Sequence, residues 1–120
     1  MTRVLEQAGH TVVGLDSYYY EDCVLGQAGS DITALRKDVR DVAPQDLKGF
    51  DAVVHLAALS NDPLGELNPD WTCDINYHAS VKLAQAAKDA GVRLFLYSSS
   101  CSMYGAAGDD AWRGRASLPT

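Results

Sequence analysis

The stretch that most constrains the fold is a short apolar run, Leu94 to Tyr97, that stops abruptly at three hydroxyl residues, Ser98 to Ser100. An apolar run of this length, bounded by polar residues, is typical of a buried strand in a parallel sheet. Ligands of open α/β sheets bind beyond the carboxyl ends of such strands. We therefore expect the serines at a ligand site, although taken alone they are more often a plain turn.

The rest of the chain alternates strand and helix patterns. A helix is expected to end at Ala8, with Gly9 at its cap, and glycine likewise follows the long helix expected from Asp70 to Ala90. Apolar, often β-branched runs predict strands between them. The resulting order of helix, strand, strand, helix, strand, helix, strand predicts a doubly wound α/β fold. The other strands are expected over Thr11 to Leu15, Ile32 to Arg36 and Asp51 to Leu56, and a short helix over Pro44 to Lys48.

Length and composition exclude several classes of protein. The 120 residues suffice for one domain, and the net charge of −6 without a basic cluster argues against a nucleic-acid partner. No apolar stretch reaches the 18 residues of a membrane span, and no signal peptide is evident. Three cysteines without CxxC spacing and three scattered histidines predict a cytoplasmic protein with reduced thiols and no metal site.

Asp16 is the first candidate for a ligand contact. It ends the first expected strand, where an acid in a dinucleotide fold accepts hydrogen bonds from ribose hydroxyls and repels a 2′-phosphate. No arginine follows it directly, so the local sequence favours NAD over NADP. An exposed acid at a strand end is common, and Asp16 alone does not decide the matter.

Other candidates follow the same logic. Asp38 and Val39 come after the second strand and could flank an adenine, the carboxylate accepting from its amine and the valine packing on its ring. Ala57 and Ala58 let backbone lie close to a cofactor, or simply allow tight packing. Asn76 is a poor helix former within the long helix, where a buried amide could bridge neighbouring strands.

Together these blocks resemble the extended short-chain dehydrogenase/reductase family, and within it the NAD-dependent sugar-nucleotide epimerases and dehydratases. The resemblance covers nearly the whole chain, and its strength comes from the spacing of the blocks. They are Gly9-His10, Val12 to Asp16, Lys37 to Asp41, Val54 to Ala58, Asn76 and Ser98 to Gly105.

The resemblance implies a role for each matching residue. Ser100 matches the catalytic hydroxyl that bonds the sugar 4-hydroxyl while a tyrosine takes its proton and NAD takes the C4 hydride. Asn76 and Tyr104 match structural residues of the family. The implied cofactor contacts are Asp16, Asp38, Val39, Leu56, Ala57, Ala58 and Ser98, and the implied substrate-side residues are Ser60, Ser99, Cys101 and Ser102.

One departure separates subfamilies. The similar 4,6-dehydratases carry Asp-Glu directly after the catalytic hydroxyl, where this chain has Cys101 and Ser102. Neither is a carboxylic acid, which argues against dehydration and favours epimerase chemistry or, as an alternative, reduction of a 4-keto sugar with NAD(P).

Two family motifs are missing from the sequence. It has no GxxGxxG turn to hold the pyrophosphate and no Tyr-x-x-x-Lys to move the proton. We therefore interpret residues 1–120 as an incomplete Rossmann domain without a substrate domain, and Met1 as an internal methionine of a longer frame or the start of a degraded gene. The resemblance also implies that the family's first strand, which precedes that turn and is central in the strand order 3-2-1-4-5-6, is missing. Its loss is expected to leave two separate strand pairs with exposed apolar edges, unless the chain pairs those strands directly or borrows a strand from a partner.

The sequence thus predicts a fragment of an NAD-dependent sugar-nucleotide epimerase, acting in its intact form on a nucleotide-sugar and inactive alone. A non-catalytic module, forming a homodimer through the helix Asp70 to Ala90, and a gene remnant stay open as alternatives.

Overall fold

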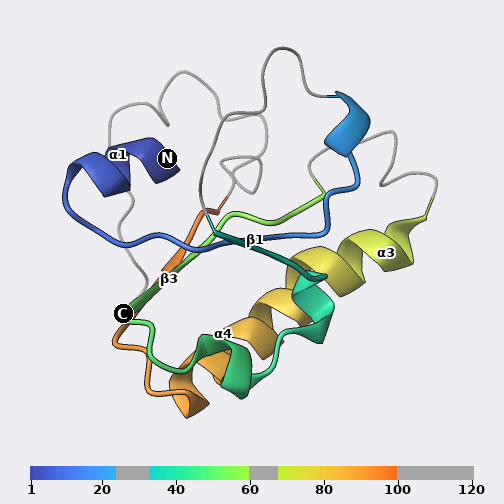
Figure 1. Cartoon of the computed structure of the whole chain (residues 1–120). Helices are drawn as coiled ribbons and strands as arrows, with labels where there is room; N and C mark the ends of the chain where they lie inside the picture. Colours follow the sequence, from blue (N-terminus) through green and yellow to red (C-terminus); the bar gives the residue numbers. More distant parts are fainter. Residues whose placement is uncertain (24–32, 60–67, 100–120) are drawn as a thin grey trace, which may run out of the picture.

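The computed structural model describes residues 1–23, 33–59 and 68–99, in which short parallel strands alternate with helices (Figure 1). The predicted α/β class is confirmed. In chain order the elements are α1 (Thr2–Gln7), β1 (Gly14–Asp16), the 3₁₀ turn η1 (Glu21–Cys23), β2 (Ala34–Arg36), the 3₁₀ turns η2 (Val39–Asp41) and η3 (Pro44–Leu47), β3 (Ala52–His55), α3 (Pro69–Cys73), the π-helical turn η4 (Asp74–His78), α4 (Ala79–Asp89) and β4 (Leu94–Tyr97).

The strands form two separate parallel pairs. In the first, β1 pairs with β2, so that Asp16 lies opposite Arg36. In the second, β3 pairs with β4, so that His55 lies opposite Tyr97. Within the described ranges no strand joins the two pairs, and of the arrangements that the missing strand left open, separate pairs are the one observed.

The strands are shorter than their apolar runs. The first was expected over Thr11 to Leu15, but it begins at Gly14, whose N–H donates to the carbonyl of Thr33 at 2.9 Å. Among the described residues three of β1 pair with three of β2, and a strand extends only where such partners are present. Pairing therefore sets these bounds more than composition does.

The long helix predicted over Asp70 to Ala90 is confirmed, with a π-helical turn in its middle. It begins at Pro69 after the cap residue Asn68, whose side chain accepts from the N–H of Asp70 at 3.2 Å. It ends before Gly91, which has the left-handed φ of +81° that glycine adopts readily. The turn η4 inserts one residue into the helical repeat, a feature that often marks functional sites.

A single core lies beneath both strand pairs. Its buried members are Val42, Leu47, Leu83, Ala86 and Ala87, three of them on α4. Leu15 of the first pair packs on this core, and so do Val53 and Phe95 of the second. Figure 1 shows the helix α3–α4 running beneath the strands. The two pairs are thus held in one unit by α4, although no strand connects them.

The prediction that the second pair consists of buried strands is only half right. Alternate side chains point to opposite faces of a strand, and Val53, His55 and Phe95 face the helix. On the other face Val54, Leu94 and Leu96 are 37%, 50% and 48% exposed. Helix α4 covers one face, and α1 contributes no buried residue.

None of the helices in the described ranges has both the length and the apolar character that crossing a bilayer would demand.

Candidate functional site

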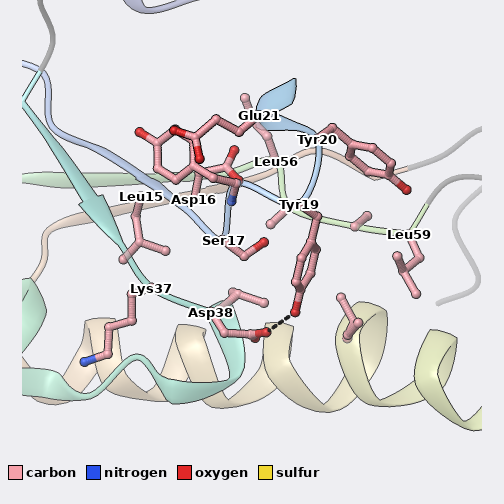
Figure 2. A pocket seen from close by; sticks show the side chains of 15 residues that line it. Leu15, Asp16, Ser17, Tyr19, Tyr20, Glu21, Lys37, Asp38, Leu56 and Leu59 are labelled. Carbon is pink, nitrogen blue, oxygen red and sulfur yellow. Dashed lines mark hydrogen bonds between the residues drawn. The ribbon is translucent and has the colours of Figure 1, made fainter. Parts of the chain in front are cut away.

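A cavity of about 450 Å³ lies where β1, β2 and β3 end (Figure 2). Because three strand ends meet there, both pairs run in the same direction and contribute to one site. Its lining comprises residues 15–21, 37–39 and 56–59 together with Ile75 of the helix.

The cavity brings together nearly all of the expected cofactor contacts. Those that line it are Asp16, Asp38, Val39, Leu56, Ala57 and Ala58. Ser98 does not line it; it continues the second pair by donating its N–H to the carbonyl of His55 at 3.1 Å, and Ser99 follows it as an exposed residue. The other predicted site residues lie outside the described part of the chain: Ser60, Ser100, Cys101, Ser102 and Tyr104.

Asp16 holds a tight turn at the mouth of the cavity. Its Oδ1 accepts from the backbone N–H of Tyr18 at 2.7 Å. Tyr18 has a φ of +59°, a left-handed conformation that costs a non-glycine residue some strain. The carboxylate thus fixes the turn from which Tyr19 extends across the cavity (Figure 2).

Arg36 is a neighbour of Asp16 that the local sequence concealed. It lies opposite Asp16 in the parallel register, stacks over the Tyr18 ring at 4.7 Å and forms an ion pair with Glu21. The hydrogen bond that Arg36 donates to Glu21 raises the pKa of the guanidinium above its usual value. Only strand pairing could have placed this arginine beside the acid.

Asp38 carries the most strongly bound carboxylate of the site. Arg40 donates to it from its backbone N–H and from two guanidinium nitrogens, at 2.8 to 3.0 Å, and Tyr19 donates its hydroxyl at 3.1 Å. These hydrogen bonds, Arg40 first, hold the pKa of Asp38 well below its usual range. A carboxylate therefore stands at the base of the cavity at every physiological pH.

A second ion pair fixes the chain just beyond β2. Lys37 donates to Asp46 at 2.6 Å, and the same oxygen accepts from the N–H of Ala43 at 2.8 Å. Both partners are partly buried, and the contact with Lys37 lowers the pKa of Asp46. The Lys37 side chain is thereby held at the turn η3 by its ion pair with Asp46.

Asn76 lies in the π-helical turn and grips the segment that follows β3. Its Oδ1 accepts from the N–H of Leu59, and its Nδ2 donates to the Leu59 carbonyl, both at 2.8 Å. The amide was expected to bridge neighbouring strands; it instead joins the helix to the loop that carries Leu56, Ala57 and Ala58. The two hydrogen bonds pair the side-chain amide with one residue's backbone N–H and C=O, as a neighbouring strand would, and they fix that loop at the edge of the cavity.

His55 extends this network into the core. Its Nε2 lies 2.7 Å from the Ser80 hydroxyl, which in turn donates to the carbonyl of Asn76 at 2.8 Å. The ring is 3% exposed, and burial lowers its pKa below the usual value. His55 entered the sequence argument only as part of a motif, because nothing local predicts its partner 25 residues away.

Metal binding gains no support from the described ranges, in which no group of three or more potential ligands is found.

The comparisons with known proteins agree with this arrangement. The model of the NAD-dependent epimerase/dehydratase family matches residues 1–118. The chain belongs to this family. The description of the family states that its members depend on NAD, and the predicted family resemblance is confirmed.

Individual relatives include two UDP-glucose 4-epimerases and a protein solved with a UDP-sugar acid and NAD. UDP-glucose 4-epimerase of Klebsiella pneumoniae is 30% identical over 110 residues, covering 84% of this chain and 79% of the relative. The structure of UDP-glucose-4-epimerase from Stenotrophomonas maltophila, with bound NAD and formylated UDP-arabinopyranose, is 31% identical with a TM-score of 0.72. MoeE5 in complex with UDP-glucuronic acid and NAD is 30% identical with a TM-score of 0.74.

The match covers most of this chain but only about a third of each solved structure. It covers 84% of this chain and 33% of the Stenotrophomonas enzyme, and 89% of this chain and 34% of MoeE5. The chain therefore spans about one third of the length of these structures.

Proposed function

We propose that this chain forms the adenosine-binding half of the NAD site of a sugar-nucleotide 4-epimerase. The observation that carries the proposal is the convergence of Asp16, Asp38 with Val39, and Leu56 to Ala58 on one cavity at three strand ends. Ribose hydroxyls, an adenine and the cofactor backbone are the chemistry that an acid, an acid with a valine, and small residues suit.

The residues present fit NAD better than NADP. Asp16 offers a carboxylate at the mouth of the cavity, which accepts hydrogen bonds from a diol and repels a phosphate. Arg36 could attract a phosphate, but it is already paired with Glu21 and stacked on Tyr18. The discrimination is therefore an electrostatic one set mainly by Asp16.

The reacting end of the site is proposed from the resemblance alone. Ser98 would lie on the nicotinamide side, and Ser100 would hold the sugar 4-hydroxyl, with Ser60, Ser99, Cys101 and Ser102 facing the substrate. NAD, when bound, supplies the hydride acceptor for C4 of the sugar. The protein's part is to hold that hydroxyl in line and to exclude water.

We further propose that residues 1–120 form an incomplete dinucleotide-binding domain and do not turn over a nucleotide-sugar alone. The printed sequence contains neither the GxxGxxG turn nor a Tyr-x-x-x-Lys. Without the first, the pyrophosphate lacks its backbone donors; without the second, no tyrosine is poised to move the proton.

Binding of ADP-ribose and of its 2′-phosphorylated analogue tests the proposal. The unaltered chain should bind ADP-ribose more tightly, and Asp16→Asn should weaken ADP-ribose binding while narrowing the difference between the two ligands. Asp89→Asn removes the same charge from an exposed position on α4, where the remaining amide oxygen can still accept from Gln85. That control should leave both affinities unchanged.

Either of two results would contradict the proposal. One is saturable binding that Asp16→Asn and Asp89→Asn affect equally, which would place the ligand elsewhere. The other is an absence of saturable binding to the folded chain.

A second function, self-association through the long helix, is favoured by exposed apolar side chains along it. Trp71, Tyr77 and Val81 are 62%, 61% and 55% exposed. We propose that they form the contact of a homodimer. Sedimentation equilibrium should show a concentration-dependent dimer that Val81→Glu disrupts, whereas a monomer at all concentrations would exclude it.

A further inference from the structure

The carboxylate of Asp38 has no acceptor position to spare. Its Oδ1 accepts from the backbone N–H and the Nε of Arg40, at 2.9 and 3.0 Å. Its Oδ2 accepts from Nη2 of Arg40 at 2.8 Å and from the hydroxyl of Tyr19 at 3.1 Å. A carboxylate offers about four acceptor positions, and four donors occupy them here. A further donor must displace one of the four.

Three of these donors belong to Arg40 and are the harder ones to remove. They include a charge-assisted pair to both carboxylate oxygens, a geometry that is stronger than a neutral hydrogen bond. Arg40 is also held from behind, by Asp74 of the helix at 3.4 Å and by Lys82, which donates to its carbonyl. Arg40 therefore stays on Asp38 when a ligand arrives.

Tyr19 is the neutral donor and reaches Asp38 from the cavity side. Figure 2 shows its ring crossing the cavity with the hydroxyl directed at Asp38, while the ring of Tyr20 points away. Tyr19 is 67% exposed, and it follows Tyr18, whose left-handed φ directs the chain across the cavity. Its hydrogen bond joins residues 19 positions apart in an exposed setting, where water can replace it.

We propose that Tyr19 gates the part of the cavity that receives the adenine. Its hydroxyl occupies the position on Asp38 that the exocyclic amine of an adenine requires. The proposal depends on the proposed function, since it concerns the same nucleotide site. When the amine binds, the Tyr19 hydroxyl is released to water. A purine without an amine at C6 cannot take over this hydrogen bond and does not compete with Tyr19 for it.

The test compares AMP with purine riboside 5′-monophosphate, which differs only in lacking the amine, by ligand-observed NMR titration. Tyr19→Phe keeps the ring and removes only the hydroxyl. A net hydrogen bond is worth enough that this variant should bind AMP roughly two- to tenfold more tightly. Its affinity for purine riboside monophosphate should not change. Tyr97→Phe makes the same change at a tyrosine of β4 that does not line the cavity; it is the matched control and should alter neither affinity.

Three results would overturn the gate. If Tyr19→Phe binds AMP equally or more weakly, the hydroxyl does not compete with the amine. If the variant binds both nucleotides more tightly to the same extent, the effect concerns the ring and not the hydrogen bond. If neither nucleotide binds any of the three folded proteins, the proposed function fails and the gate fails with it.

Discussion

The two strand pairs of this molecule are built in opposite ways. In β3–β4, Val53, His55 and Phe95 pack against α4, and His55 is buried and bonded to the helix through Ser80. In β1–β2, Leu15 is the member that reaches the core, and every residue of β2 is exposed.

The first pair relies instead on charged and polar contacts at its carboxyl end. Arg36 pairs with Glu21, Lys37 with Asp46, and Arg40 with Asp38. The pair of Arg36 with Glu21 is exposed, and the other two are partly buried. Ion pairs that keep contact with water contribute less to stability than apolar burial does, so the free energy of unfolding resides mainly in the second strand pair and its helix. The acids that we assign to ligand binding lie on the first. On this proposal the carboxylates that meet the ligand come from the first pair, whereas the second pair supplies most of the apolar packing and also carries the loop from Leu56 to Ala58 at the cavity.

The largest effect is expected from the core beneath both pairs. Leu83→Ala leaves a cavity among buried side chains and should cost about 2–5 kcal/mol in the free energy of unfolding. Lys88→Ala, at an exposed position on the same helix, should stay within about 0.5 kcal/mol. Urea titrations followed by circular dichroism measure both. Equal losses would mean that α4 does not pack as described.

Asn76→Ala should come next, since it removes both contacts to Leu59 and leaves backbone groups of the cavity loop unpaired. The expected cost is about 1–3 kcal/mol, with a weaker affinity for ADP-ribose at temperatures where the variant stays folded. Gln85→Ala, which removes an exposed amide from the same helix, is the control. If the affinity for ADP-ribose is unchanged in Asn76→Ala, the two hydrogen bonds to Leu59 are not needed to position the loop.

Stability should depend on pH differently for the two strand pairs, through a buried histidine in the second and through ion-paired carboxylates at the end of the first. Burial lowers the pKa of His55, so the unfolded chain binds a proton more readily, and stability should fall as the pH drops below about 6.5. The pKa values of Asp38 and Asp46 are also lowered, and their contribution is lost only as the pH falls below about 4.

Unfolding titrations across this range check the assignment. His55→Gln should flatten the profile between pH 7.5 and 5, whereas His10→Gln, at an exposed position, should leave it unaltered. A profile that keeps its slope in His55→Gln would assign the near-neutral step to another group.

The smallest effect is expected at Arg36, whose ion pair with Glu21 joins side chains 59% and 57% exposed. Arg36→Met should lower the free energy of unfolding only slightly, because water screens an exposed ion pair, and about 0.5 M salt should largely abolish the difference. A loss as large as that of Leu83→Ala would show that the first pair depends on this arginine.

The sequence predicts much of this arrangement because its signals are local. Apolar runs, Pro69, and the glycines at 9 and 91 locate the strands and helix ends within a few residues. Asp16 and Asp38 could be proposed for the site because each follows its own strand directly. The separation of the strand pairs is one of the arrangements that the family's strand order left open.

What the sequence could not predict depends on contacts between distant residues. Arg36 reaches Asp16 only through the parallel register, and Tyr19 reaches Asp38 across 19 positions. The partner of His55 lies on another element, and the exposure of Leu94 and Leu96 depends on which face the helix covers. Such pairings are decided by tertiary structure, on which a local pattern carries no information.

The central claim is that the cavity at the three strand ends receives the adenosine half of NAD. Backbone amide NMR of the ¹⁵N-labelled chain, titrated with ADP-ribose, tests it most directly. The account predicts saturable shifts concentrated at Asp16, Asp38, Val39, Ala57 and Ala58, with the amides at the far end of α4 unmoved. Shifts confined to other regions, or none at saturating ligand, would contradict it.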